Sequence, residues 1–140
     1  MKLLRPLRIF LLHARSDEEA VARLYKRLVK AGANVWLDKK NLLPGQDWQS
    51  EIHQAIHSSD IVIVCLSKRF NEQGGYRHEE LRIALEKANL LPDGTIFMIP
   101  LRLEECDTPQ PLLRWQRVDL FETNGYKELL AALKEQIALM

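Results

Sequence analysis

Ile61-Val62-Ile63-Val64-Cys65-Leu66 is the most apolar and most β-branched run in this 140-residue chain. Such side chains suit a pleated, buried surface, so the run predicts the central strand of a sheet. Leu7 to His13 is a second short, nearly all-apolar run, and that pattern is typical of a strand covered on both faces. The two runs favour an α/β domain.

The segment between these runs predicts a helix and a further strand. Ser16 begins Ser-Asp-Glu-Glu, a capping box in which Glu19 follows the cap by three residues, and Gly32 would end the helix. The inward face of that helix is expected to consist of Ala20, Val21, Leu24, Tyr25, Leu28 and Val29. Asn34 to Asp38 follows as a short strand, so this order predicts a parallel pair with a right-handed crossover.

The rest of the chain continues the alternation. Pro44-Gly45 is a turn signal, and Trp48, Ile52, Ala55 and Ile56 then mark one face of a second helix. A polar loop after Ser67 leads to a third helix, Thr95 to Leu103 and Arg117 to Phe121 predict two more strands, and Tyr126 to Ile137 predicts a closing helix. Five strands that alternate with helices predict a flavodoxin-like, doubly wound α/β fold with the parallel strand order 2-1-3-4-5.

Composition narrows the class of protein. The length fits one domain over residues 1–140, with residues 1–6 expected to be flexible. A net charge of +1 favours neither nucleic acid nor an anionic membrane as a partner. Cys65 and Cys106 lack CxxC spacing, so a reducing, cytoplasmic setting is expected. The N-terminus interleaves charges with leucines and no run approaches ~18 apolar residues, so neither a signal peptide nor a membrane span is expected.

The helix near residue 80 carries two adjacent glutamates in different settings. Helical spacing places Leu81, Ala84, Leu85 and Ala88 on one apolar stripe, and Glu79, Arg82 and Glu86 on the opposite side. Glu80 falls at the edge of the stripe, one turn from Tyr76, with Ile83 and Lys87 on the same border. A carboxylate that is oriented and partly desolvated is suited to chemistry, whereas an ion pair with Arg77 is the structural alternative.

Topology brings this helix to the place where open parallel sheets bind ligands. That place lies beyond the C-terminal ends of the strands, where the strand order reverses, which here is between the first and third strands. The residues expected there are His13, Ala14, Arg15 and Ser16 after the first strand, Ser67 and the loop to Tyr76 and Glu80 after the third, and Asp38 at the end of the second. Glu80 is therefore expected at a ligand-binding crevice.

Several familiar sites do not match these positions. The loop after the first strand, His-Ala-Arg-Ser-Asp-Glu, contains no glycine, which excludes a dinucleotide fingerprint and a phosphate-binding P-loop. A phospho-receiver domain would need an aspartate at the end of the third strand, where this chain has Cys65-Leu66-Ser67. His53 and His57 lack a third ligand, so no metal site is expected. Nothing indicates a catalytic triad around Ser67.

Four segments, in order, resemble those of a bacterial Toll/interleukin-1 receptor (TIR) domain. Arg8 to Ala14 resembles the first box of that family, Val35 to Asp38 through Pro44-Gly45 its second strand and BB loop, and Ser59 to Ser67 its third strand. Tyr76 to Leu81 resembles the WxxxE motif, with Tyr76 in place of the tryptophan and Glu80 as the glutamate. The resemblance covers essentially the whole chain.

The TIR family includes enzymes that cleave the nicotinamide–ribose bond of NAD+ and scaffolds that signal through TIR–TIR contacts. The resemblance implies that Glu80 is the catalytic residue and that NAD+ is a substrate, with no other cofactor. By position it also implies substrate contacts from His13, Ala14, Arg15, Asp38, Asn41, Leu43, Pro44, Gly45, Ser67 and Tyr76. Trp48 is expected to anchor its helix in the core rather than to stack on a base.

The function expected from the sequence is that of an NAD+ glycohydrolase in prokaryotic defence or signalling. The resemblance implies activation by self-association, in which the loop from Asn41 to Gly45 of one copy completes the site of another, driven by a sensor domain or partner. The product is ADP-ribose or a cyclic form of it, depending on whether water or the adenine reaches the ribose carbon. The main alternative is a non-catalytic adaptor that uses the same loop, and the second is a nucleoside-processing transferase or hydrolase.

Overall fold

A parallel sheet of five strands forms the centre of the computed structural model, which describes residue 3 and residues 6–37, 41–72 and 76–140, with only the backbone of residues 76–78. The strands are β1 (Arg8–Leu12), β2 (Asn34–Trp36), β3 (Ile61–Leu66), β4 (Met98–Arg102) and β5 (Val118–Asp119). Their order in the sheet is β2-β1-β3-β4-β5, which confirms the predicted flavodoxin-like topology.

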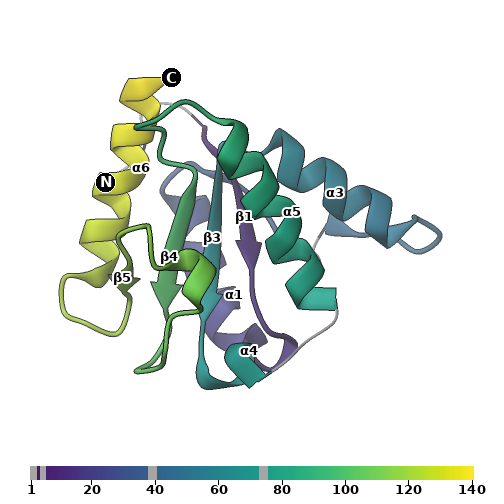
Figure 1. Cartoon of the computed structure of the whole chain (residues 1–140), viewed down its shortest axis with the longest axis horizontal. Helices are drawn as coiled ribbons and strands as arrows, with labels where there is room; N and C mark the ends of the chain where they lie inside the picture. The colour runs from purple at the N-terminus through teal and green to yellow at the C-terminus, as the bar shows by residue number, and fades with distance from the viewer. Residues whose placement is uncertain (1–2, 4–5, 38–40, 73–75) are drawn as a thin grey trace.

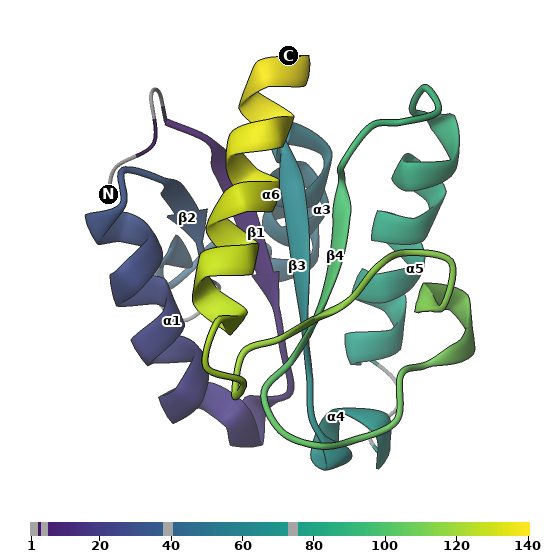
Figure 2. The same cartoon turned by 90° about the vertical axis from the view of Figure 1, so that its left-hand side faces the viewer.

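Two pairs of helices cover the two faces of the sheet (Figures 1 and 2). α1 (Glu18–Lys30) and α6 (Gly125–Leu139) share a core with Ile9, Leu11, Ile61 and Ile63, whereas α3 (Trp48–Ser58) and α5 (Tyr76–Leu90) share a core with Phe10, Leu12, Val62 and Val64. The two sets alternate because successive side chains of a strand point to opposite faces. Every residue of β3 is buried, as the opening run of the sequence predicts for the central strand.

Short helices lie where the first and third strands end. η1 (Arg15–Asp17) follows β1, and α4 (Lys68–Glu72) follows β3 within the segment predicted to be a polar loop. A helix of one turn is too short to show an apolar period, so the sequence pattern could not reveal α4. The predicted capping box is wrong, because Ser16 lies inside η1 and the N-cap of α1 is Asp17, whose side chain makes no capping hydrogen bond.

The predicted elements differ from the observed ones mainly at their ends. Gly32 ends α1 with a φ of 101°, as predicted, but Val29 is exposed instead of facing the core. The second, fourth and fifth strands are each shorter than the apolar runs that predict them. Leu3 donates its backbone N–H to the carbonyl of Ala31 at 2.7 Å. The expected flexibility of residues 1–6 stays a prediction, since residues 1–2 and 4–5 lie outside the described part.

Candidate functional site at the C-terminal edge of the sheet

The chain leaves β1 through a buried turn. His13 and Ala14 are buried and Arg15 is exposed. The Nδ1 atom of His13 lies 2.8 Å from the carbonyl oxygen of Ala14. Because a carbonyl oxygen can only accept, Nδ1 must carry the proton of this hydrogen bond, which fixes the orientation of the imidazole ring. The three predicted substrate-contacting residues therefore lie at the expected strand end, with only Arg15 open to solvent.

A hydrogen bond joins two loops at the C-terminal edge of the sheet, at the point where the strand order reverses. Ser67, which is buried, donates from its Oγ to Oδ2 of Asp17 and accepts the backbone N–H of Phe70 at 3.0 Å. The first bond joins the turn after β1 to the turn after β3, and the second caps α4. Asp17 was not among the predicted site residues, although it lies in the loop where the sequence places the site.

Glu80 is far more deeply buried than its predicted border position implies. Only 3% of the residue is exposed, and the neighbouring buried positions of α5 are Leu81, Ile83 and Ala84. At 3.6 residues per turn, Glu80 and Ala84 lie between Ile83 and Leu81 on the helix surface. The buried face of α5 is thus centred near Glu80, because α3 packs against this side of α5, which a helical pattern alone cannot reveal.

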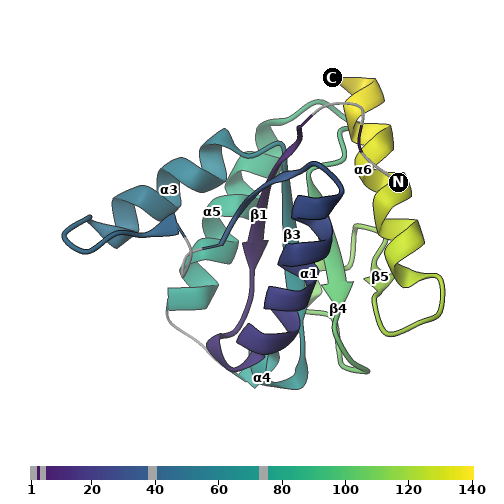
Figure 3. The same cartoon turned by 180° about the vertical axis from the view of Figure 1, so that it is seen from behind.

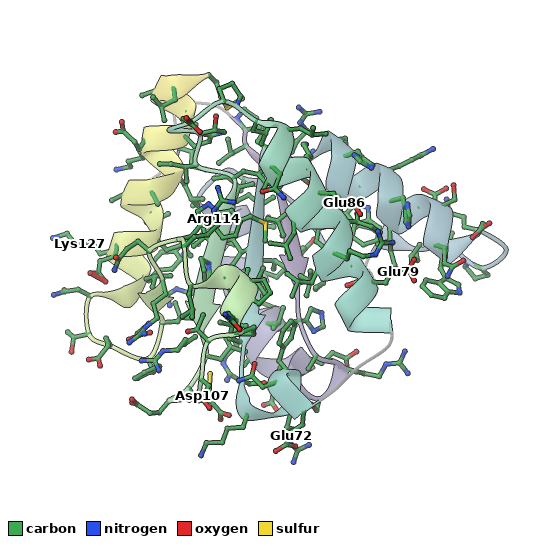
Figure 4. The ribbon with its side chains drawn as sticks, viewed as in Figure 1. Glu72, Glu79, Glu86, Asp107, Arg114 and Lys127 are labelled. Atoms are coloured by element: carbon green, nitrogen blue, oxygen red, sulfur yellow. The ribbon has the colours of Figure 1, made fainter. Side chains whose placement is uncertain are left out.

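The opposite glutamate behaves as predicted. Glu79 has a half-exposed side chain and lies 3.5 Å from Nη2 of Arg82, whose Nη1 donates to Glu86 at 2.6 Å (Figure 4). These three residues form the solvated face of α5. The side chains of Tyr76 and Arg77 lie outside the described part of the chain, so the predicted stacking of Tyr76 and the alternative ion pair of Arg77 with Glu80 stay predictions.

A narrow crevice separates α3 from α5 and reaches Glu80. Its walls include Trp48, Ile52 and His53 from α3 and Glu79, Glu80 and Ile83 from α5, and it encloses about 10 Å³. Such a space holds about one water molecule. We call it the α3–α5 crevice. The crevice leads from the surface of the molecule, near the first turn of α5, to the buried side chain of Glu80.

Trp48 is not the core anchor that the sequence predicts. Its side chain is 46% exposed, and Ile52, Ala55 and Ile56 attach α3 to the core without it. Trp48 is the first residue of α3, where Asp47 caps the helix by accepting the N–H of Ser50 at 3.3 Å. Trp48 also lines the α3–α5 crevice, together with the two glutamates.

The loop before α3 extends away from the sheet (Figures 1 and 3). Oδ1 of Asn41 accepts the N–H of Leu37 at 2.9 Å, and Leu43 exchanges two hydrogen bonds with Gln46. Leu43 is 65% exposed, and Pro44 and Gly45 are exposed as well. Asp38 lies outside the described residues. Within one copy the described part of this loop is open to solvent, so its predicted contacts with substrate stay predictions.

A larger groove lies beside β5, the edge strand of the sheet, and the sequence did not predict it. It has a volume of about 670 Å³ and is lined by residues on both sides of β5, among them Trp115, Arg117, Asp119 and Glu128. Asp119 accepts two hydrogen bonds from the buried Arg102, at 2.7 and 2.8 Å. These bonds hold the pKa of Asp119 below its usual range. The wall of the groove at Asp119 is therefore fixed by an ion pair with the buried Arg102.

Two other chemistries concern the thiol of Cys65 and the binding of metal ions. Burial raises the pKa of Cys65, with a further contribution from the charge of Asp17, so this thiol is not a nucleophile at neutral pH. In the described ranges, no three His, Cys, Asp or Glu side chains come together as metal ligands. Within the same ranges, none of the helices combines the length and the hydrophobicity needed to cross a lipid bilayer.

The strand order defines the class first: a flavodoxin-like α/β domain. Within that class, the model of the TIR domain family matches residues 9–134. The chain therefore belongs to the TIR domain family, as the four sequence segments predict.

The chain is also similar to individual proteins and to solved structures of the same fold. The chain is 32% identical over 88 residues to an uncharacterized protein of Sinorhizobium fredii, and the match covers 63% of this chain and 14% of that protein. The chain thus spans about a seventh of the length of that curated relative. Among solved structures, the TIR domain of the Toll-related receptor TRR-2 of Hydra magnipapillata superposes with a TM-score of 0.74 at 22% identity, covering 89% of this chain and 96% of that one. The TIR domains of the activated Roq1 resistosome give 0.67 at 19% identity, with coverages of 96% and 99%.

Proposed function

We propose that this TIR domain is an NAD+ glycohydrolase and that Glu80 is its catalytic residue. The observation that carries the proposal is the setting of Glu80, a residue that is 3% exposed and yet lines a crevice between α3 and α5. A carboxylate in a largely desolvated position interacts strongly with a cation brought next to it, because little water screens the attraction.

The chemistry of NAD+ cleavage suits a carboxylate acting alone. Nicotinamide leaves a cationic pyridinium as a neutral molecule, so no acid is needed to protonate the leaving group. The ribose then develops oxocarbenium character, and a carboxylate held beside it stabilises that charge. Glu80 would hold the ribose hydroxyls and the developing cation, Arg15 would contact the pyrophosphate, and water or the adenine would attack the ribose carbon.

The size of the crevice supports activation by assembly. About 10 Å³ does not accommodate a dinucleotide, so the substrate needs additional walls or a local opening of α3 and α5. The loop from Leu43 to Gly45 offers exposed surface for this role in a second copy. A resistosome is the setting in which the Roq1 TIR domains were solved, which makes assembly a reasonable expectation for this fold. The longer bacterial relative is consistent with a sensor region in a prokaryotic defence or signalling protein.

Nicotinamide release from concentrated protein tests the proposal. Wild type should cleave NAD+, and Glu80→Gln, which keeps the size of the side chain, should lose roughly 10²- to 10⁴-fold in kcat. Glu86→Gln is the matched control, since it makes the same chemical change on the solvated face of the same helix, outside the crevice, and it should retain activity within a few-fold. Circular dichroism and urea unfolding establish that both variants fold.

Two results would contradict the proposal. One is a loss of activity in Glu86→Gln as large as that in Glu80→Gln. The other is a silent wild type even when it is clustered on a scaffold at high local concentration, and this result would favour the adaptor function, for which the exposed Leu43 is the supporting observation. Cleavage of nucleosides in place of NAD+ would instead favour a nucleoside-processing enzyme.

A further inference from the structure

The outer edge of β4 is covered only at its end. β5 pairs with the last two residues of β4, and the described residues supply no strand partner for the rest on that side (Figure 1). The carbonyl of Phe97 accepts the N–H of Val62, so Phe97 faces β3. The carbonyl of Arg102 accepts the N–H of Leu120, so Arg102 faces the outer side. Because successive residues of a strand direct their backbone groups to opposite sides, the N–H and C=O of Met98 face outward.

The backbone groups of Met98 have no hydrogen-bond partner among the described residues. The outward positions on either side of it are protected. The N–H of Ile96 donates to Oε1 of Gln136 at 3.3 Å, and Pro100 has no N–H to offer. Edge strands commonly limit pairing by such means. Within the described part of β4, Met98 is thus the position at which a further extended segment can pair.

An apolar hollow lies beside this open position. Its volume is about 280 Å³, and its lining includes Ile96, Met98, Leu129 and Ala132. The side chain of Met98 packs in the core on the α3 and α5 side of the sheet, whereas Leu129 belongs to the core on the α6 side. The hollow therefore meets Met98 at its backbone. We call this space the β4–α6 hollow.

The β4–α6 hollow continues into the larger groove beside β5, since Trp115 and Glu128 line both. The charge that remains available in that groove is negative. Arg117 is neutralised by Asp119, whose Oδ1 lies 3.3 Å from its Nε. Glu122 and Glu128 are exposed, line the groove, and form no ion pair within the described ranges. The two spaces thus combine an apolar pocket with a pair of accessible carboxylates.

We propose that this edge of the sheet binds an extended peptide segment of a partner protein, in which an apolar residue and a lysine or arginine lie two positions apart. The segment pairs with the N–H and C=O of Met98 as an added strand. Side chains two positions apart in a strand share a face, so the apolar side chain fills the β4–α6 hollow while the basic one meets Glu122 and Glu128. The site is separate from the α3–α5 crevice and does not depend on the proposed function.

A synthetic heptapeptide tests the inference. The probe is acetyl-Thr-Lys-Thr-Leu-Thr-Lys-Thr-amide, which carries a lysine on each side of its leucine and so fits in either strand direction. It is titrated against the isotope-labelled 140-residue chain by NMR, and the amide signal of Met98 should shift. Wild type should bind this peptide roughly 5- to 20-fold more tightly than the same peptide with glutamates in place of the lysines, because the two carboxylates attract one and repel the other.

N-methylated peptides test the backbone pairing. Alternate amides of an extended segment face the same side, so methyl groups on the lysine and leucine nitrogens block one edge of the peptide and methyl groups on the two inner threonine nitrogens block the other. One of these two peptides should lose binding roughly 10-fold or more, and the other should bind like the unmodified peptide. Equal affinities of the two would contradict pairing with β4.

Substitutions in the chain test the two pockets separately. Ala132→Leu fills the β4–α6 hollow and should weaken binding roughly 10-fold or more, whereas Ala131→Leu makes the same change on the exposed face of α6 and should leave it unchanged. Replacing Glu122 and Glu128 together by glutamine should abolish the preference for the lysine peptide. Glu135→Gln, also on α6 but outside both spaces, should retain that preference. Circular dichroism establishes that each variant folds.

Three results would overturn the inference. The first is the absence of binding of the lysine peptide to wild type. The second is equal affinity for the lysine and glutamate peptides, or unchanged binding to a folded Ala132→Leu variant. The third is a concentration-dependent self-association of the chain that Ala132→Leu abolishes while the peptide leaves the Met98 signal unmoved, because this edge would then be an interface between copies.

Discussion

At the scale of single residues, the hydrogen bond between Asp17 and Ser67 connects two turns that are 50 positions apart in the sequence. Ser67 also accepts the N–H of Phe70, so its hydroxyl caps α4 while it holds the loop after β1. Ser67→Ala should lower the free energy of unfolding by about 1–2 kcal/mol, because the hydrogen bond donated to Asp17 and the cap of α4 are both lost. Urea unfolding measures the change.

A double-mutant cycle isolates the bond itself. Asp17→Ala and Ser67→Ala should each destabilise the protein, while the double variant should be more stable than the sum predicts by about 1 kcal/mol. Additive effects would show that the two side chains do not interact energetically. Ser16→Ala is the matched control for Asp17→Ala, since Ser16 lies one residue away in η1, is exposed, and is not the cap that the sequence pattern suggests.

At the scale of secondary-structure elements, a side chain from α5 terminates α3. Nζ of Lys87 donates to the carbonyl oxygens of His57 at 2.6 Å and Ser59 at 2.8 Å, and lies 3.4 Å from that of Ile56. A cation at a helix C-terminus satisfies carbonyls that have no partner within the helix and interacts favourably with the helix dipole. The ring of Phe97 lies 4.8 Å from the same ammonium group. Lys87 therefore joins the two helices that form the crevice.

Lys87→Met should destabilise the protein by about 1–2 kcal/mol. Methionine keeps most of the apolar stem but cannot donate, so the carbonyls at the end of α3 lose their partner. Burial lowers the pKa of Lys87, which means that the charged group is itself partly desolvated, and its removal recovers some of that cost. Lys127→Met, on the exposed face of α6 (Figure 4), is the matched control and should change the free energy of unfolding by less than about 0.5 kcal/mol. Equal effects of the two substitutions would contradict a specific role for Lys87.

The elements differ in how far the sequence predicts them. β1 and β3 are predictable because local composition alone reports strands covered on both faces, and the alternation with helices then predicts the strand order. α4 is not predictable, since a helix of a single turn shows no apolar period. The N-cap of α1 is not predictable either, since Asp17 is fixed by a hydrogen bond from Ser67, which is 50 positions away in the sequence. The helical pattern distinguishes Glu80 from Glu79, but the full burial of Glu80 and the exposure of Trp48 follow from how α3 meets α5, which is a non-local property.

At the scale of the whole molecule, an ion pair joins the ends of two neighbouring strands, β4 and β5, at the C-terminal edge of the sheet. Arg102 at the end of β4 binds Asp119 at the end of β5, with side chains that are 8% and 20% exposed. Arg82 and Glu86 form a comparable pair on the surface, at 2.6 Å against 2.7 Å for Arg102 and Asp119, but their side chains are 57% and 63% exposed. Burial, and not distance, should decide which pair matters for stability, because a buried arginine that loses its close partner keeps only Glu105, at 3.9 Å, and cannot regain its hydration.

Asp119→Asn should therefore lower the free energy of unfolding by about 2–3 kcal/mol at pH 7, whereas Glu86→Gln should lower it by less than about 0.5 kcal/mol. The pH dependence identifies the cause. Because the pKa of Asp119 is depressed in the folded state, mainly through its hydrogen bond from Arg102, this carboxylate stabilises the fold above its unfolded pKa of about 3.9 and loses that contribution as the pH falls through the lower, folded value. Urea unfolding from pH 7 down to pH 2 should thus show a difference between wild type and Asp119→Asn that is constant above about pH 5 and shrinks below about pH 4. A difference that stayed constant throughout this range would mean that the loss comes from altered packing around β5 and not from the charge of Asp119.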